Sequence, residues 1–166
     1  MAQVVRSDEV RPQPWGDAGG TTRELARDDA GAWRISLADI PAEAAFTAFA
    51  GRHRVLTVVE GPVLDLVVDG VAHVIEPQRP FGFSGDASVV ASVPEGPVRA
   101  LDVVVDPASV QPFVTVLELG RSSTLPLADD QAAYVLTGAD ARCLVVGPGE
   151  VAGRCTVAVV TLARVG

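Results

Sequence analysis

The stretch Leu64-Asp-Leu-Val-Val-Asp-Gly-Val-Ala-His-Val-Ile75 decides the fold class of this chain. Its first part alternates, so that Leu64, Leu66 and Val68 share one face of a strand. Asp69-Gly70 follows, and this dipeptide is the strongest two-residue hairpin signal in the chain, because both residue types tolerate a positive φ. The apolar residues after it return as a second strand. The stretch therefore predicts a tight antiparallel β-hairpin.

Similar short, Val-rich segments recur on both sides of this hairpin, and Gly or Pro residues separate them. Their regular spacing is typical of an antiparallel sandwich or barrel. Single helical turns are expected over 42–48 and 107–110, and no long amphipathic helix is visible. We expect strands at 21–26 and 33–40 and expect these two to pair with each other. Besides the hairpin, the further predicted strands are 55–60, 81–83, 87–93, 98–105, 114–119, 132–136, 142–146 and 156–162.

The length and the charge narrow the class of protein. The chain has 166 residues, which suggests one domain, 1–166, with a first half of about 1–106 and a second half of about 107–166 that could be a diverged copy.

The net charge is −8 and all thirteen basic residues are Arg. A negative chain is a poor partner for nucleic acid or an anionic membrane surface. Without Lys, a Schiff base and a P-loop are excluded.

Compartment and redox state follow from simple counts. The N-terminal residues contain no apolar stretch of signal-peptide length, and no segment is long enough to span a membrane, so we expect a cytoplasmic protein. Cys143 and Cys155 are the only cysteines, on two neighbouring strand-like segments, and we expect free thiols.

No recognised catalytic or metal motif occurs. The two histidines, His53 and His73, lie twenty residues apart, which is no known ligand spacing, and there is no Cys-x-x-Cys. Neither a Gly-x-Ser-x-Gly nucleophile motif nor a Gly-rich nucleotide loop is present. We therefore expect no metal, no cofactor and no catalytic residue.

Two local clusters are unusual. In residues 14–24, Trp15 stands beside a Gly-rich turn and a Thr pair, which could receive an anion on its backbone N–H groups or could simply cover a barrel edge with Trp15 in the core. In residues 33–38, alternation places Arg34 and Ser36 on the face opposite the large apolar residues.

The role of Arg34 depends on what that face meets. If Arg34 faces the interior of a barrel, its guanidinium could donate two hydrogen bonds to a carboxylate ligand. If it faces water, it is a solvated charge. A third alternative is an internal ion pair with Glu24. Arg52-His-Arg54 adds positive charge nearby. Arginines gathered around one cavity would reverse the sign of the local potential in this acidic protein.

Several ordered motifs together resemble the HutD/Ves family over nearly the whole chain. They are Pro14-Trp-Gly-Asp-Ala-Gly-Gly-Thr-Thr-Arg-Glu-Leu25, Trp33-Arg-Ile-Ser-Leu-Ala-Asp-Ile40 and Ala44-Ala-Phe-Thr-Ala-Phe-Ala-Gly-Arg-His-Arg54, followed by the Glu-Gly turn at 60–61, the Asp-Gly hairpin and the Phe-x-Phe-x-Gly-Asp turn at 81–86. The resemblance implies an all-β cupin-type fold with two cupin-like halves in one compact domain. It also implies a regulatory or small-molecule-binding role associated with histidine utilisation, with urocanate, formate or a related carboxylate as ligand.

The family motif matches this chain at seven candidate positions, Trp15, Thr22, Glu24, Arg34, Ser36, Phe49 and Arg54, and Thr47 keeps a hydroxyl in the third motif. The chain departs from the family where Lys-Asn is replaced by Gly16-Asp17 and where Asp-x-Asn is replaced by Ala100-Leu-Asp102.

The leading hypothesis is a non-catalytic bicupin that binds a small carboxylate and reports the level of a catabolite. In it, Arg34 or Arg54 pairs with the carboxylate and Glu24 orients an arginine. Ser36 and Thr22 contribute single hydrogen bonds, Trp15, Phe49 and Phe83 form apolar walls, and Asp102 completes the ligand-binding set.

Two alternatives stay open. One is a metal-free isomerase, epimerase or lyase with Glu24 and Asp102 as acid and base. The other is an interaction protein with a vestigial pocket, and exposed strand edges make a homodimer a further possibility.

Overall fold

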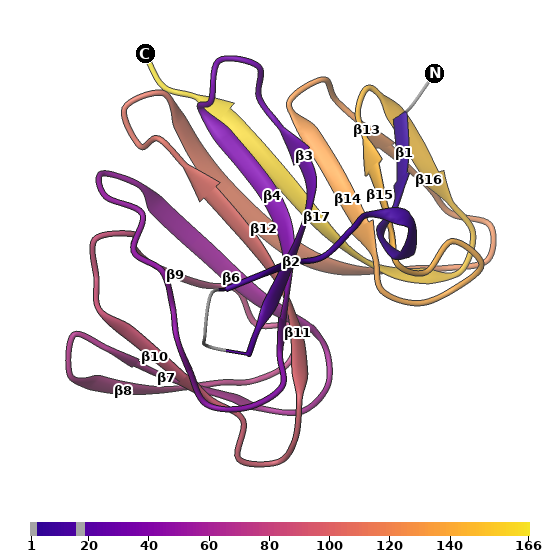
Figure 1. The fold of residues 1–166 in the computed structure, drawn as a ribbon. Helices are drawn as coiled ribbons and strands as arrows, with labels where there is room; N and C mark the ends of the chain where they lie inside the picture. The colour runs from indigo at the N-terminus through magenta and orange to yellow at the C-terminus, as the bar shows by residue number, and fades with distance from the viewer. Residues whose placement is uncertain (1–2, 16–18) are drawn as a thin grey trace.

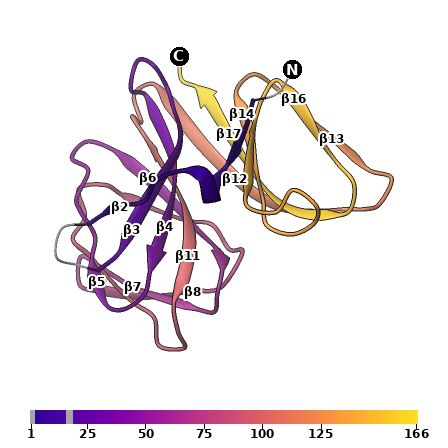
Figure 2. The same cartoon turned by 45° about the vertical axis from the view of Figure 1, so that its right-hand side comes forward.

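The computed structural model describes residues 3–15 and 19–166 and is built almost entirely of antiparallel strands. Figures 1 and 2 show two groups of sheets joined side by side, one formed by β2–β11 and the other by β12–β17 together with the N-terminal β1. No helix in the described part of the chain is long and apolar enough to cross a membrane.

The first group packs a six-stranded sheet against a four-stranded sheet. The six-stranded sheet has the order β2 (Gln13–Pro14), β3 (Thr21–Arg27), β4 (Trp33–Ile40), β11 (Val98–Val105), β6 (His53–Glu60) and β9 (Phe81–Ser84). The four-stranded sheet has the order β5 (Ala44–Ala45), β10 (Val89–Ser92), β7 (Leu64–Val68) and β8 (Val71–Ile75).

The second group packs a five-stranded sheet against a two-stranded sheet. The five-stranded sheet has the order β1 (Gln3–Arg6), β15 (Cys143–Val146), β14 (Gln131–Val135), β17 (Cys155–Arg164) and β12 (Val110–Leu119). The two-stranded sheet pairs β13 (Thr124–Leu127) with β16 (Gly149–Ala152). The division near residue 106 stays a prediction, and β1 crosses it by pairing with β15.

Three core layers separate the four sheets. One lies inside the first group around Leu56, Leu64 and Leu66, and another inside the second group around Val157 and Val159. The largest lies between the six-stranded and five-stranded sheets and includes Tyr134. Both faces of the six-stranded sheet are therefore buried, which is why its central strands are so rich in Val, Leu and Ile.

Alternate side chains of strand β4 point into two different core layers, one on each face of the six-stranded sheet. Ile35 and Leu37 point into the core between the two groups, whereas Ile40 points into the core of the first group. Arg34 and Ser36 share the face of Ile40, as the strand period requires. The predicted apolar face is confirmed, and on the opposite face Ser36 is buried whereas the Arg34 side chain is 34% exposed.

The hairpin predicted from the opening stretch is present. Strands β7 and β8 pair antiparallel with Val68 opposite Val71, and Asp69 and Gly70 have φ values of +47° and +82°. The predicted pairing of 21–26 with 33–40 is also confirmed, as β3 with β4.

Of the two predicted helical turns, the one over 42–48 is wrong, whereas the one over 107–110 is present as a single turn. Residues 42–48 form no helical turn, because Ala44 and Ala45 are strand β5 and pair with β10 instead. Residues 107–110 form a turn in which the Val110 N–H donates to the Asp106 carbonyl at 2.9 Å, without continuing into a helix. The one helical element among the described residues is a 3₁₀ turn, η1 (Ser7–Glu9), which the sequence analysis missed.

Both cysteines are free and buried, as expected. Cys143 lies at the start of β15 and Cys155 at the start of β17, and β14 lies between these two strands in the sheet. The two strands are therefore neighbours neither in sequence, where β16 separates them, nor in the sheet.

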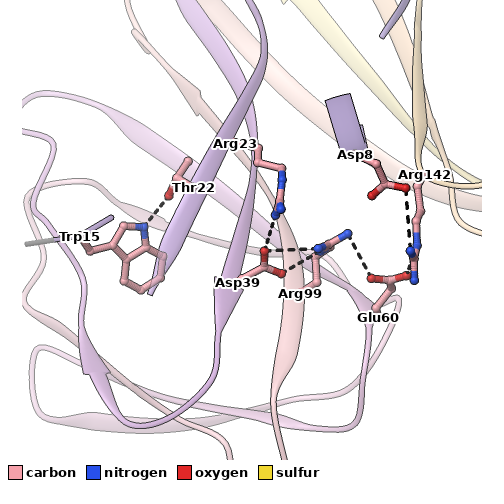
Figure 3. Close-up of polar contacts among 8 residues, drawn as sticks. All are labelled: Asp8, Trp15, Thr22, Arg23, Asp39, Glu60, Arg99 and Arg142. Atoms are coloured by element: carbon pink, nitrogen blue, oxygen red, sulfur yellow. Dashed lines mark hydrogen bonds and ion pairs between the residues drawn. The ribbon is translucent and has the colours of Figure 1, made fainter. Parts of the chain in front are cut away.

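A chain of ion pairs links the two groups of sheets along one side (Figure 3). Asp39 accepts from Arg23 at 2.6 Å and from Arg99 at 2.7 Å. Glu60 continues the chain, 3.4 Å from Arg99 and 2.9 Å from Arg142 of the second group. Together with the core around Tyr134, these contacts hold the two groups in register.

Candidate functional site

A small pocket lies inside the first group of sheets, against one face of the six-stranded sheet. Its volume is about 40 Å³, enough for a few water molecules or one small polar group. Strands β3, β4, β6 and β11 supply one side, and loop residues including Trp15 supply the rest. The lining residues are Trp15, Thr22, Arg34, Ser36, Ala38, Phe46, Thr47, Phe49, Arg54, Leu56 and Asp102.

Arg54 and Asp102 form a buried ion pair in this pocket. Arg54 Nη2 lies 2.7 Å from Asp102 Oδ2, and Arg54 Nε donates to Oδ1 at 3.4 Å. The third nitrogen, Nη1, donates to the backbone carbonyl of Thr47 at 3.3 Å. Arg54 is 5% exposed. Its guanidinium is thus engaged at all three nitrogens by protein groups.

Aromatic rings surround the same guanidinium. The ring centroids of Phe46, Phe49 and Phe83 lie 5.3, 4.9 and 5.1 Å from Arg54 Cζ. At this separation a cation is attracted by the face of a ring. Phe83 does not line the pocket, so its place is beside Arg54 rather than at the cavity surface.

Arg34 is bound much less completely. Its Nε lies 3.8 Å from Glu24 Oε1, beyond hydrogen-bond length, and has no hydrogen-bond partner among the described residues although it is buried. The Arg34 Cζ lies 4.8 Å from the ring centroid of Phe49. The structure combines the three alternatives for Arg34: the side chain lines the pocket, pairs loosely with Glu24 and is 34% exposed to water.

Ser36 resembles Arg34 in lacking a partner. Its Oγ is buried and makes no hydrogen bond within the described part of the chain. Leaving such a group unsatisfied costs about 1–3 kcal/mol, so it usually has a water or ligand partner. Arg34 and Ser36 follow each other on one face of β4, and both line the same pocket.

Trp15 and Thr22 form a separate wall (Figure 3). The Trp15 indole N–H donates to Thr22 Oγ1, and the ring meets Phe46 edge-to-face at 5.4 Å between centroids. The indole lies directly against Gly20, where any Cβ would overlap it. These contacts explain Gly20 and Thr22 of the motif. The sequence departures at Gly16 and Asp17 lie outside the described residues.

Seven of the nine predicted site residues line the pocket, and the other two adjoin it. Glu24 stands beside Arg34, and Phe83 packs against Arg54. Alternation along 33–38 also places Ala38 on the face of Arg34 and Ser36, although Ala38 was not among the predicted site residues, and the same rule along 53–60 could have added Leu56. Sequence reasoning missed Phe46, which sits in a loop where no periodicity applies.

The two histidines do not converge. The His73 ring packs against Phe81 with 4.8 Å between centroids, and no group of three or more metal-ligating side chains occurs within the residues that the structure describes.

Comparison with known proteins points to one family. The family model named HutD matches residues 7–155. A protein from Pseudomonas putida, described as an uncharacterized 21.2 kDa protein in the hutC 3' region, is 34% identical over 116 residues, covering 63% of this chain and 58% of that protein. Protein Ves from Escherichia fergusonii is 35% identical over 98 residues, covering 53% of this chain and 50% of its own. The chain thus spans between half and three-fifths of these relatives.

A solved structure matches over the full length. HutD from Pseudomonas fluorescens SBW25, determined in a formate condition, aligns with a TM-score of 0.74 and 29% identity, covering 100% of both chains. The all-β cupin-type fold expected from the sequence is confirmed.

Proposed function

This chain belongs to the HutD family, and from that premise we propose that its pocket binds a small carboxylate and reports the level of a catabolite, without catalysing a reaction. Formate and urocanate are the ligands that the family resemblance suggests. A role in histidine utilisation is part of the proposal, supported by the hut-related names of two similar proteins.

The observation that carries the proposal is the pair of unsatisfied groups on β4. Arg34 Nε and Ser36 Oγ are both buried without a partner among the described residues, and both line one pocket. A guanidinium and a hydroxyl are a suitable donor pair for a carboxylate, which only accepts hydrogen bonds. Binding would satisfy both groups at once.

Arg54 has a different place in this proposal. Because Asp102 and the Thr47 carbonyl already occupy its nitrogens, Arg54 is less available to a ligand than Arg34. We assign the carboxylate to Arg34 and Ser36, and we assign the Arg54–Asp102 pair to shaping the cavity.

The enzymatic alternative has less support. Both oxygens of Asp102 face Arg54, and Glu24 stands outside the pocket lining, 39% exposed at its side chain. Neither carboxylate is aimed alone into the cavity, as a general acid or base would need to be.

A thermal-shift titration of the purified protein tests the proposal. Formate, urocanate and formylglutamate would be compared with imidazole and neutral sugars. A carboxylate at 100 times its dissociation constant adds about 2.7 kcal/mol to the free energy of unfolding. We expect a saturable shift that is lost in Arg34→Met and kept in Arg79→Met, since Arg79 is exposed and does not line the pocket. No shift with any carboxylate would overturn the proposal.

A further inference from the structure

A second hollow adjoins the pocket on the far side of Arg34. Its volume is about 170 Å³, and its lining includes Arg27, Arg34 and Arg52 with the rings of Trp33 and Phe49. We call it the basic recess. Arg34 and Phe49 line both the recess and the pocket, so the two spaces meet at these side chains.

We propose that the ligand of this site is a dicarboxylate, whose second carboxylate lies in the basic recess against Arg27 and Arg52. This inference rests on the proposed function, because the first carboxylate is the one assigned above to Arg34 and Ser36.

The charge of the recess supports this class of ligand. Three of its lining residues are arginines and none is acidic, in a chain whose net charge is −8. Glu24 is the nearest counter-charge, and it lies 3.8 Å from both Arg27 and Arg34. Arg52 makes no ion pair within the described residues. The recess therefore has surplus positive charge, which one additional carboxylate would balance.

Arg52 is held in place before any ligand arrives. Its Nη1 donates to the carbonyl of Gly31 at 2.9 Å, which ties the side chain to the β3–β4 connection and leaves its other nitrogens for a ligand. Its backbone is fixed as well: the Gly85 N–H donates to the Arg52 carbonyl at 2.7 Å, and the Phe49 N–H donates to the Gly85 carbonyl at 2.8 Å. A donor fixed in this way loses little entropy on binding.

Arg27 approaches from the opposite strand. It is the residue of β3 directly across from Arg34 of β4, and its side chain is 67% exposed. An exposed guanidinium contributes less to affinity than a half-buried one, because water screens its charge. We therefore place the main share of the second contact on Arg52.

The relative sizes of the two spaces agree with a two-headed ligand. The inner pocket has room for one carboxylate, whereas the recess is several times larger and has aromatic walls. The ring of Phe49, shared by both, offers an apolar surface for the short chain between the two acidic groups.

Isothermal titration with paired probes of equal carbon number tests the inference. Succinate, glutarate and adipate would each be compared with butyrate, pentanoate and hexanoate at low ionic strength. We expect the best dicarboxylate to bind about tenfold more tightly than its monocarboxylate, the scale of one added charge-assisted contact. In Arg52→Gln this ratio should fall to near one, while the exposed-site control Arg79→Gln should keep it.

The outcomes separate this inference from the proposed function. If monocarboxylates bind in an Arg34-dependent manner but no dicarboxylate binds more tightly, the recess is not a second subsite and the proposed function stands. The same conclusion follows if the dicarboxylate advantage survives in Arg52→Gln with unchanged thermal stability. If neither class of acid binds, both proposals are wrong.

Discussion

Arg54 on β6 and Asp102 on β11 hold each other across two adjacent strands inside the first group of sheets, with Nη2 and Oδ2 2.7 Å apart. Both are nearly inaccessible to water, at 5% and 7% exposure. The attraction between two buried charges offsets the free-energy cost of removing them from water only when both partners are present. The pair therefore makes the shape of the pocket depend on two side chains at once.

Breaking this pair from one side should be costly. We expect Arg54→Met to lower the free energy of unfolding by about 3–5 kcal/mol, because Asp102 would be left as a buried, uncompensated charge. Urea denaturation measures the loss. The double variant Arg54→Met with Asp102→Leu should recover most of it, and a double variant no more stable than the single one would contradict this view of the pair.

Gly85 should tolerate no side chain. A Cβ there would overlap the Phe49 carbonyl oxygen and lie 2.9 Å from that of Arg52, so Gly85→Ala must displace the loop that carries both residues. We expect a loss of about 1–3 kcal/mol in urea unfolding and weaker carboxylate binding. Gly120→Ala is the matched control, since a Cβ there lies 3.4 Å from Ser123 Oγ and should change stability by less than about 0.5 kcal/mol.

Tyr134 should make the protein less stable at alkaline pH. Burial raises the pKa of this tyrosine above its usual value of 10.0, and the charge of Glu60 adds to the rise. Above about pH 10 the unfolded chain releases this proton while the folded chain keeps it, so stability falls as pH rises, by up to about 1.4 kcal/mol per pH unit. Urea unfolding between pH 8 and pH 11 should show a shallower decline in Tyr134→Phe, and identical slopes would refute the assignment.

The two thiols should be unreactive in the folded protein. Burial raises the pKa of both Cys143 and Cys155, so the reactive thiolate is scarcer at pH 8 than for a free cysteine. A disulfide reagent such as DTNB should modify two thiols rapidly in urea and far more slowly in native buffer. Rapid native labelling of Cys143→Ser would show that Cys155 is accessible.

Local patterns predicted much of the candidate site. Alternation along β4 placed Arg34 and Ser36 on one face, and the structure turns that face into the pocket. The same rule applied to 53–60 and 98–105 would have added Leu56, because it shares a face with Arg54. Phe46 could not be predicted, since its position depends on a loop that closes over a sheet distant in sequence.

Apart from the Glu24–Arg34 pair, which was one of the alternatives for Arg34, partners across strands were beyond local reasoning. Local patterns left open whether Arg34 or Arg54 pairs with the carboxylate, and they placed Asp102 in the ligand-binding set or, in the enzymatic alternative, as an acid–base candidate. Pairing β6 with β11 brings Arg54 to Asp102, and pairing β3 with β4 brings Arg27 opposite Arg34. The strand registers therefore distinguish Arg54, whose guanidinium is bound by Asp102, from Arg34, whose Nε has no hydrogen-bond partner among the described residues.

The sequence by itself determined the all-β class, the Asp69-Gly70 hairpin and the two faces of each strand, because turn chemistry and a two-residue period are local properties. Only the tertiary structure decided which charges are neutralised and which stay free. That outcome depends on side chains that lie far apart in the chain, 48 positions for Arg54 and Asp102 and 82 for Glu60 and Arg142, which only the packed sheets bring within hydrogen-bond distance. The same packing leaves Arg34 Nε and Ser36 Oγ among the buried polar atoms without a hydrogen-bond partner in the described residues, and it gathers the three arginines of the basic recess.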